Sequence, residues 1–147
     1  MHWGMIRVSC LLALAGGSIF STPVAQASDA ARLSGTYQVI HKSEVGGQAE
    51  VQVQIHLANR GLRDLHIQRV TFWDLSHPAK GGTQSCSLVL PSSGSADTTQ
   101  QFTVSLAEYE LWRRGTRPRL VLEIAVPHGH PTTEVVHLDR ISSGKVN

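Results

Sequence analysis

Histidine side chains are the first candidates for chemistry in this chain, because neutral imidazole is a common ligand of transition metals. His128 and His130 are one residue apart in the segment Pro127-His-Gly-His-Pro131. Two imidazoles on such a constrained loop can both reach one Zn²⁺ or Cu²⁺ ion, and Glu134 and His77 are candidates for a third ligand. The alternative is an exposed polar turn, since two ligands without a preorganised surrounding bind a metal weakly.

A second group of residues suits the binding of anions. Arg113, Arg114, Arg117 and Arg119 follow closely after Trp112. Guanidinium groups bind carboxylate and phosphate in a bidentate manner, and an indole ring can stack against the bound group. We therefore expect this segment to bind an envelope protein or another anionic surface component. The alternative is a solvated loop in which the arginine stems cover the Trp112 ring.

A third candidate is Trp73 in the segment Phe72-Trp-Asp74. Neighbouring side chains on a strand point to opposite faces, so Trp73 faces outward if Phe72 belongs to the core. An outward tryptophan is either part of an interface or covered by a loop.

Common catalytic motifs are absent from the sequence. It contains no Gly-x-Ser-x-Gly, His-Glu-x-x-His, phosphate-binding loop or Cys-x-x-Cys. The formal net charge is only +2, which does not favour a nucleic-acid partner. We expect a binding or scaffolding protein and not an enzyme.

The elements that must position these residues are strands. From Glu50 to Leu57 every second residue is apolar, which predicts a strand with one buried face. Similar alternation predicts further strands, and its phase slips between Ile67 and Val70, which predicts a bulge near Gln68 and Arg69. The other predicted strands cover residues 36–41, 65–72, 84–90, 101–106, 120–126 and 132–140.

Two segments depart from this pattern. Ala107 to Arg114 contains good helix formers and is followed by Gly115, so we expect one short helix or 3₁₀ turn. Pro91 to Thr99 is rich in serine and glycine and is expected to be an exposed connection. About seven antiparallel strands with one short helical turn predict an all-β fold, a Greek-key immunoglobulin-like sandwich over residues 34–141.

The first 27 residues are typical of a secretory signal peptide. Arg7 precedes an apolar run from Val8 to Phe20, and the small-x-small triplet Ala25-Gln-Ala27 follows. The alternative is an uncleaved N-terminal anchor, although the run is short for a membrane span. We expect a cleaved leader, a polar lead-in over 28–33, a polar tail over 142–147, and a periplasmic or extracellular protein without a transmembrane segment.

Cleavage would leave Cys86 as the sole cysteine, so no disulfide could form within the chain. Cys86 alternates with Leu88 and Leu90, which favours a buried packing role over a disulfide between two chains.

The stretch from Val51 to Leu75 reads V-x-V-x-I-x-L-x-N-x-G-x-x-x-L-x-I-x-x-V-x-F-x-D-L. It resembles the core of small immunoglobulin-like domains. These include the water-stress and hypersensitive-response domain of late-embryogenesis-abundant proteins, and exported bacterial domains of the FxLYD or CARDB type. The resemblance implies binding, scaffolding or stress protection, without catalytic residues.

Overall fold

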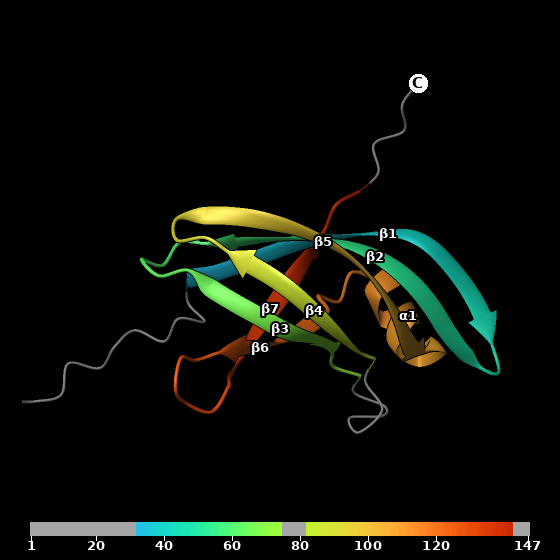
Figure 1. The fold of residues 1–147 in the computed structure, drawn as a ribbon. Helices are drawn as coiled ribbons and strands as arrows, with labels where there is room; N and C mark the ends of the chain where they lie inside the picture. Colours follow the sequence, from blue (N-terminus) through green and yellow to red (C-terminus); the bar gives the residue numbers. More distant parts are fainter. Residues whose placement is uncertain (1–31, 75–81, 143–147) are drawn as a thin grey trace, which may run out of the picture.

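A computed structural model describes residues 32–74 and 82–142 of the chain. The chain folds mainly as strands, with one short helix between the fifth and sixth of them (Figure 1). The elements in chain order are β1 (Leu33–Val45), β2 (Gln48–Asn59), β3 (Leu65–Phe72), β4 (Thr83–Leu90), β5 (Gly94–Ser105), α1 (Leu106–Arg113), β6 (Arg119–Ala125) and β7 (Thr132–Arg140).

The strands form one seven-stranded sheet in the order β4-β3-β6-β7-β1-β2-β5, which is nearly closed into a barrel. β1, β2 and β5 form one layer, and β3, β4 and β6 face it across the core (Figure 1). The all-β prediction is therefore confirmed.

The prediction of exclusively antiparallel strands is wrong at one place. β7 pairs with β1 in parallel, with Gly35 opposite Leu138 and Tyr37 opposite Arg140. β7 thereby joins the two layers. A Cβ atom on Gly35 would lie 2.6 Å from Leu138 Cδ2, so the missing side chain permits this close approach. Alternation within a strand reports its buried face but not the direction of its neighbour, which is why the sequence did not predict this pair.

The core lies between the layers and follows the predicted alternation. Val51, Val53, Ile55 and Leu57 of β2 are all fully buried. The register of β3 shifts between Ile67 and Arg69 against both of its neighbours, which confirms the predicted bulge. This bulge returns the later apolar side chains of β3 to the inner face, where Val70 and Phe72 are fully buried.

The first strand is longer than predicted. β1 continues to Val45, and Gly46 and Gly47 connect it to β2 with φ angles of +58° and +77°. Positive φ at both central residues is the requirement of a tight two-residue hairpin turn, which glycine meets without strain.

The prediction of an exposed connection over 91–99 is wrong for most of its length. β5 begins at Gly94 and pairs with β2 continuously from Gly94–Asn59 to Ser105–Gln48. Strand pairing uses backbone groups, so a long partner strand can order a polar segment at the end of a sheet.

Helix α1 matches the predicted short helix. Ser105 is its N-cap, and the Ser105 hydroxyl accepts a hydrogen bond from the Glu108 N–H at 3.1 Å. In the part of the chain that the structure describes, no helix is long and apolar enough to cross a membrane. The predicted signal peptide lies outside the described residues.

Candidate functional site

Trp73 lies directly after β3 and faces outward, as predicted. Its side chain is 40% exposed, whereas the neighbouring Phe72 is fully buried. The Trp73 N–H donates a hydrogen bond to the carbonyl oxygen of Arg119 at 2.9 Å, which continues the pairing of β3 with β6. The backbone therefore places the Trp73 ring beside the first residue of β6.

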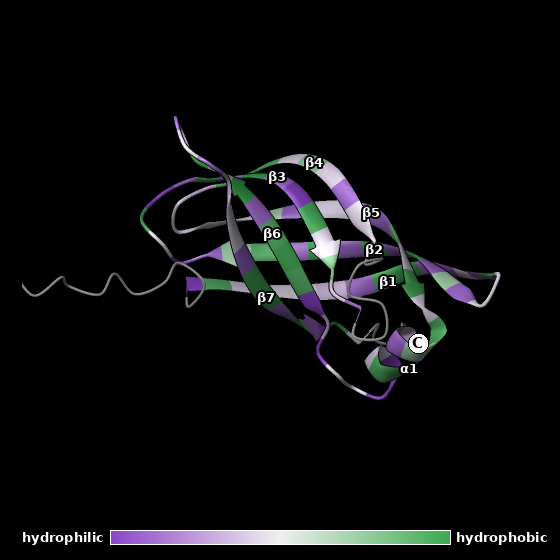
Figure 2. Ribbon diagram, turned by 90° about the horizontal axis from the view of Figure 1, so that it is seen from below, coloured by the Kyte–Doolittle hydropathy of each residue, from purple (hydrophilic) through white to green (hydrophobic). Residues whose placement is uncertain are grey.

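Arg119 places its guanidinium over this ring. The Arg119 Cζ lies 5.6 Å from the centroid of the Trp73 ring, which is the distance of a cation–π contact. Trp73 and Arg119, together with Val121 and Val135, line a surface hollow of about 200 Å³. We call these four residues the Trp73 face. It lies on the outer side of β3, β6 and β7, the layer seen nearest in Figure 2.

The Trp73 face carries a cation that has no carboxylate partner among the described residues. No carboxylate of residues 32–74 or 82–142 forms an ion pair with Arg119. Val135 is exposed and lies opposite Val121 in the register of β6 and β7. An aromatic ring, two branched apolar side chains and a guanidinium thus share one surface.

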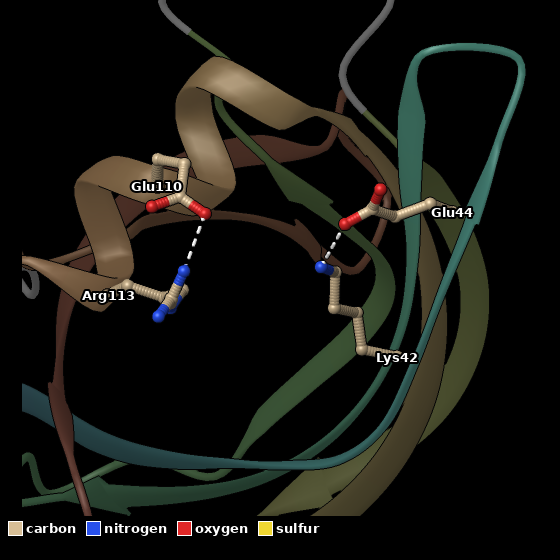
Figure 3. A network of polar contacts seen from close by, with 4 residues as sticks. All are labelled: Lys42, Glu44, Glu110 and Arg113. Carbon is tan, nitrogen blue, oxygen red and sulfur yellow. Dashed lines mark hydrogen bonds and ion pairs between the residues drawn. The ribbon is translucent and has the colours of Figure 1, made fainter.

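The other predicted arginines do not join this surface as a single basic patch. Arg113 forms an ion pair with Glu110 on α1 at 2.8 Å, and this hydrogen bond raises the pKa of Arg113 (Figure 3). Arg117 pairs with Asp139 at 2.8 Å and also donates to the His137 carbonyl. Figure 3 also shows the Lys42–Glu44 pair on β1, the strand beside α1.

Arg114 is exposed and forms the C-cap of α1, where its backbone N–H donates to the Glu110 carbonyl at 3.1 Å. Its side chain has no ion-pair partner within the described ranges. Of the predicted arginines, Arg119 and Arg114 therefore have no ion-pair partner in the described part of the chain.

Trp112 is not available to a partner, contrary to the prediction. It is only 1% exposed and packs in the core, with its ring centroid 4.8 Å from that of Phe72 and 6.0 Å from that of Tyr37. The amphipathic turn of α1 directs Trp112 inward, toward the gap between the layers. Core side chains, and not the arginine stems, therefore cover the Trp112 ring.

A buried polar network holds α1 in place, and the sequence analysis missed it. Asp74 accepts hydrogen bonds from the Ser105 N–H at 2.7 Å and from the Ser105 hydroxyl at 3.2 Å. Glu108 accepts a hydrogen bond from the Trp112 indole N–H at 3.0 Å. The Ser105-x-x-Glu108 spacing is a capping-box pattern and could have revealed the helix start. No local signal links Asp74 to it.

The histidine loop is exposed. His128 and His130 both lie on the surface between β6 and β7, and His128 has a φ of +58° in the turn. Among the residues with described positions, no group of three or more His, Cys, Asp or Glu side chains could hold a metal ion. Glu134 is half-buried at the start of β7, and His77 lies outside the described residues. The structure thus adds no third ligand to the two histidines.

Cys86 is half-buried on the inner face of β4, against the core, in line with its predicted alternation. Its Sγ donates a weak hydrogen bond to the Ile67 carbonyl at 3.7 Å. Burial raises the pKa of the Cys86 thiol.

Comparisons with known proteins supply no family. No protein-family model matches the chain, and no curated protein matches it significantly. Among solved structures, a Northeast Structural Genomics Consortium target, SoR45, has a TM-score of 0.43 at 9% identity, covering 79% of this chain and 89% of its own. A protein from Archaeoglobus fulgidus has a TM-score of 0.38 at 8% identity, covering 70% and 89%. Similarity this low carries no argument about function.

Proposed function

We propose that this protein is an exported, non-catalytic binding domain that uses the Trp73 face to bind a partner protein of the cell envelope. The segment it recognises carries an apolar side chain next to a carboxylate. The observation that carries this proposal is that the Arg119 guanidinium lies over the exposed Trp73 ring and pairs with no carboxylate of residues 32–74 or 82–142.

The chemistry of the Trp73 face matches such a segment. Tryptophan and arginine are the residue types that contribute most to protein interfaces, since each offers a large apolar area together with hydrogen-bond donors. The contact with the ring orients the guanidinium, so less side-chain entropy is lost when a carboxylate binds. Val121 and Val135 add apolar area beside it.

The proposal includes the location and the fold family. The N-terminal pattern of Arg7 and the apolar run supports export to the periplasm or the extracellular space. The strand order, with β4, β3, β6 and β7 on one side and β1, β2 and β5 on the other, supports an immunoglobulin-like Greek key in which β7 also pairs with β1. Membership of the water-stress, FxLYD or CARDB-type domains belongs to the same proposal.

Binding of a matched pair of peptides tests the proposal. One peptide alternates leucine with glutamate, and the other replaces each glutamate by glutamine. We expect the acidic peptide to shift the amide signals of residues on β3, β6 and β7 in NMR spectra, and the neutral peptide to bind about tenfold more weakly. Higher salt should weaken only the acidic peptide.

Substitutions test whether binding depends on the Trp73 face or on exposed basic side chains in general. Arg119→Gln and Trp73→Ala should each weaken binding of the acidic peptide by about tenfold. Arg113→Gln is the matched control, because Arg113 is exposed but already paired with Glu110. Equal losses for Arg113→Gln and Arg119→Gln, or no binding of the acidic peptide, would contradict the proposal.

A further inference from the structure

The loop between β2 and β3 carries the most exposed large apolar side chain of the described residues. Leu62 is 83% exposed, and the next in order is Val45 at 57%. A single exposed leucine is common on protein surfaces. Leu62, however, lies between Arg60 and Arg63, and both arginines are exposed as well. The loop therefore presents an apolar side chain flanked by two cations.

A buried asparagine fixes the shape of this loop. Asn59 is only 3% exposed, and its side-chain oxygen accepts a hydrogen bond from the Gly61 N–H at 2.8 Å. Its side-chain nitrogen donates to the carbonyl oxygens of Arg63 at 2.8 Å and Pro91 at 3.2 Å. A Cβ atom on Gly61 would lie 2.9 Å from Asn59 Oδ1, so glycine permits this close approach. Residues 60–63 thus wrap around one amide group.

The turn between β4 and β5 supports the loop from the side. The Ser93 N–H donates to the Gly61 carbonyl at 3.0 Å, and the Ser92 N–H donates to the Asp64 carboxylate at 2.7 Å. Ordering a loop costs conformational entropy, and here the loop is ordered before any partner binds. A surface that is ordered in advance loses less entropy on binding.

A third arginine adds to the positive charge of the loop. The Arg60 N–H donates to the Arg32 carbonyl at 2.9 Å, and a Cβ atom on Gly61 would lie 3.6 Å from Arg32 Cδ. These arginines and Arg63 form no ion pair within the described ranges. Asp64 is the only carboxylate of the loop, and it is already bound to the β4–β5 turn. We use the name Leu62 tip for Arg32, Arg60, Leu62 and Arg63.

The Leu62 tip lies at one end of the molecule, where β2 and β4 end and β3 and β5 begin (at the left in Figure 1). The described chain starts at Arg32 at this same end. The residues before it, which include the apolar run from Val8 to Phe20, are therefore joined to the molecule here. Trp73 and Arg119 lie at the opposite end, where β3 ends and β6 begins.

We infer that the Leu62 tip docks on the surface of a bilayer that contains anionic phospholipids. The guanidinium groups of its three arginines contact the headgroup phosphates, whose oxygens they bind in a bidentate manner. Leu62 enters the boundary between headgroups and acyl chains, where an apolar side chain is removed from water. Each cation near an anionic membrane surface adds to the attraction.

The arrangement suits a bilayer better than an acidic protein. A bilayer presents negative charge above an apolar layer over its whole surface, so three flexible arginine side chains need no fixed spacing. A protein would need a pocket for Leu62 with carboxylates placed around it, and stable protein interfaces depend mainly on aromatic anchors. Docking at this end leaves the Trp73 face at the other end of the molecule. The inference does not depend on the proposed function of that face.

Sedimentation of the full chain with two kinds of vesicles tests the inference. One kind consists of phosphatidylcholine, and the other contains equal amounts of phosphatidylcholine and phosphatidylglycerol. We expect the affinity for the anionic vesicles to be at least about tenfold higher, and to fall at higher salt. Where the N-terminal apolar run is retained it binds both kinds of vesicle, so the difference between them reports on the Leu62 tip.

Substitutions at the two ends of the molecule assign the contact. Arg60→Gln and Arg63→Gln should each reduce the affinity for anionic vesicles by about fivefold, and Leu62→Gln by about tenfold. Arg114→Gln is the matched control for the arginines, because Arg114 is exposed at the C-cap of α1 and has no ion pair in the described part of the chain. Val45→Gln is the control for Leu62, since Val45 is exposed in the β1–β2 hairpin at the opposite end. Neither control should change the affinity.

A second measurement locates the contact directly. In bicelles of the same anionic composition that carry a lipid-anchored gadolinium chelate, the amide signals of residues 60–63 should broaden most. Those of residues 43–48, in the hairpin at the opposite end, should broaden least. This pattern is expected whether or not the N-terminal run is retained.

Four outcomes would overturn the inference. These are equal affinities for the two kinds of vesicle, equal losses for Arg60→Gln and Arg114→Gln, unchanged binding of Leu62→Gln, and gadolinium broadening centred outside the β2–β3 loop. Polyglutamate is the acidic-polymer control, and binding to it as strong as to anionic vesicles would assign the tip to an acidic protein instead. Thermal melting of each variant checks that the exposed substitutions leave the fold intact.

Discussion

Two tryptophans of this chain begin from similar sequence settings and end in opposite environments. Trp73 follows β3 and is 40% exposed, whereas Trp112 on α1 is 1% exposed. Both are next to polar or charged residues in the sequence, and both were predicted to bind a partner. Only Trp73 has a surface on which it could do so.

The difference lies in the residues that surround each indole ring. Trp112 is surrounded by the rings of Tyr37, Phe72 and Tyr109, and its indole N–H has Glu108 as an acceptor. A tryptophan can be fully buried at low cost only when its N–H has a partner. Among the described residues, Arg119 lies over the ring face of Trp73, and Trp73 remains 40% exposed. One tryptophan therefore stabilises the fold and the other is available for binding.

The largest expected effect is that of Trp112→Ala. Removing this side chain leaves a cavity between the layers and deletes the indole N–H that donates to Glu108. We expect the free energy of unfolding to fall by about 3–5 kcal/mol, measured by urea denaturation. Trp73→Phe should cost less than about 1 kcal/mol in the same experiment. Equal losses for the two variants would refute the distinction between the two tryptophans.

A second prediction concerns the network below Trp112. Asp74→Ala removes the acceptor of the Ser105 N–H and hydroxyl, both buried, so we expect a loss of about 2–3 kcal/mol and a less helical far-ultraviolet spectrum. Asp139→Ala is the control, since its pair with Arg117 is exposed and should contribute less than about 1 kcal/mol. If both substitutions cost the same, Asp74 does not anchor α1.

A third prediction compares how accessible the two tryptophans are to a quencher in solution. Acrylamide should quench the fluorescence of Trp73 and hardly that of Trp112. Trp3 also fluoresces, so the test uses a Trp3→Phe background. In that background we expect Trp73→Phe to lose most of the quenchable signal while retaining the stability of the parent protein. If the remaining fluorescence, which then comes from Trp112, is still strongly quenched, Trp112 is accessible.

The smallest effect is expected at Cys86, which lies between these two extremes of burial. Its pKa is raised in the folded protein by burial, so the thiol is favoured over the thiolate. The resulting stabilisation is present below the pKa of the unfolded thiol and is lost as the pH rises through the range between the two values. At mildly alkaline pH, iodoacetamide should alkylate Cys86 more slowly in the folded protein than in urea. Equal rates would place Cys86 on the surface.

Much of the fold could be predicted from local patterns. The alternation of β2 and the phase slip near Gln68 correctly predicted a strand with one buried face and a bulge. The helix start at Ser105 follows from its capping side chain. The first half of β5 was missed because it is polar and is ordered by pairing with β2, which no property of residues 94–99 reveals.

The candidate sites were less predictable. Trp73 was correctly placed outward, but its contact with Arg119 depends on the pairing of β3 with β6. Two surface hollows over β1 combine residues of β1, β2, β5 and the end of β7, and these residues form no motif in the sequence. The alternation of β2 turns His56 away from the core, and its contact with Asp97 needs the register of β2 and β5.

By itself, the sequence determined which side of most strands is apolar, that one short helix precedes Gly115, and that Trp73 faces outward if Phe72 is buried. These features depend on side-chain direction within one element, which repeats with a local period. Only the tertiary structure decided the depth of Trp112, the parallel pairing of β7 with β1 and the meeting of Trp73 with Arg119. They depend on which elements become neighbours, and that choice is made by the burial of the whole core at once and not by any single segment.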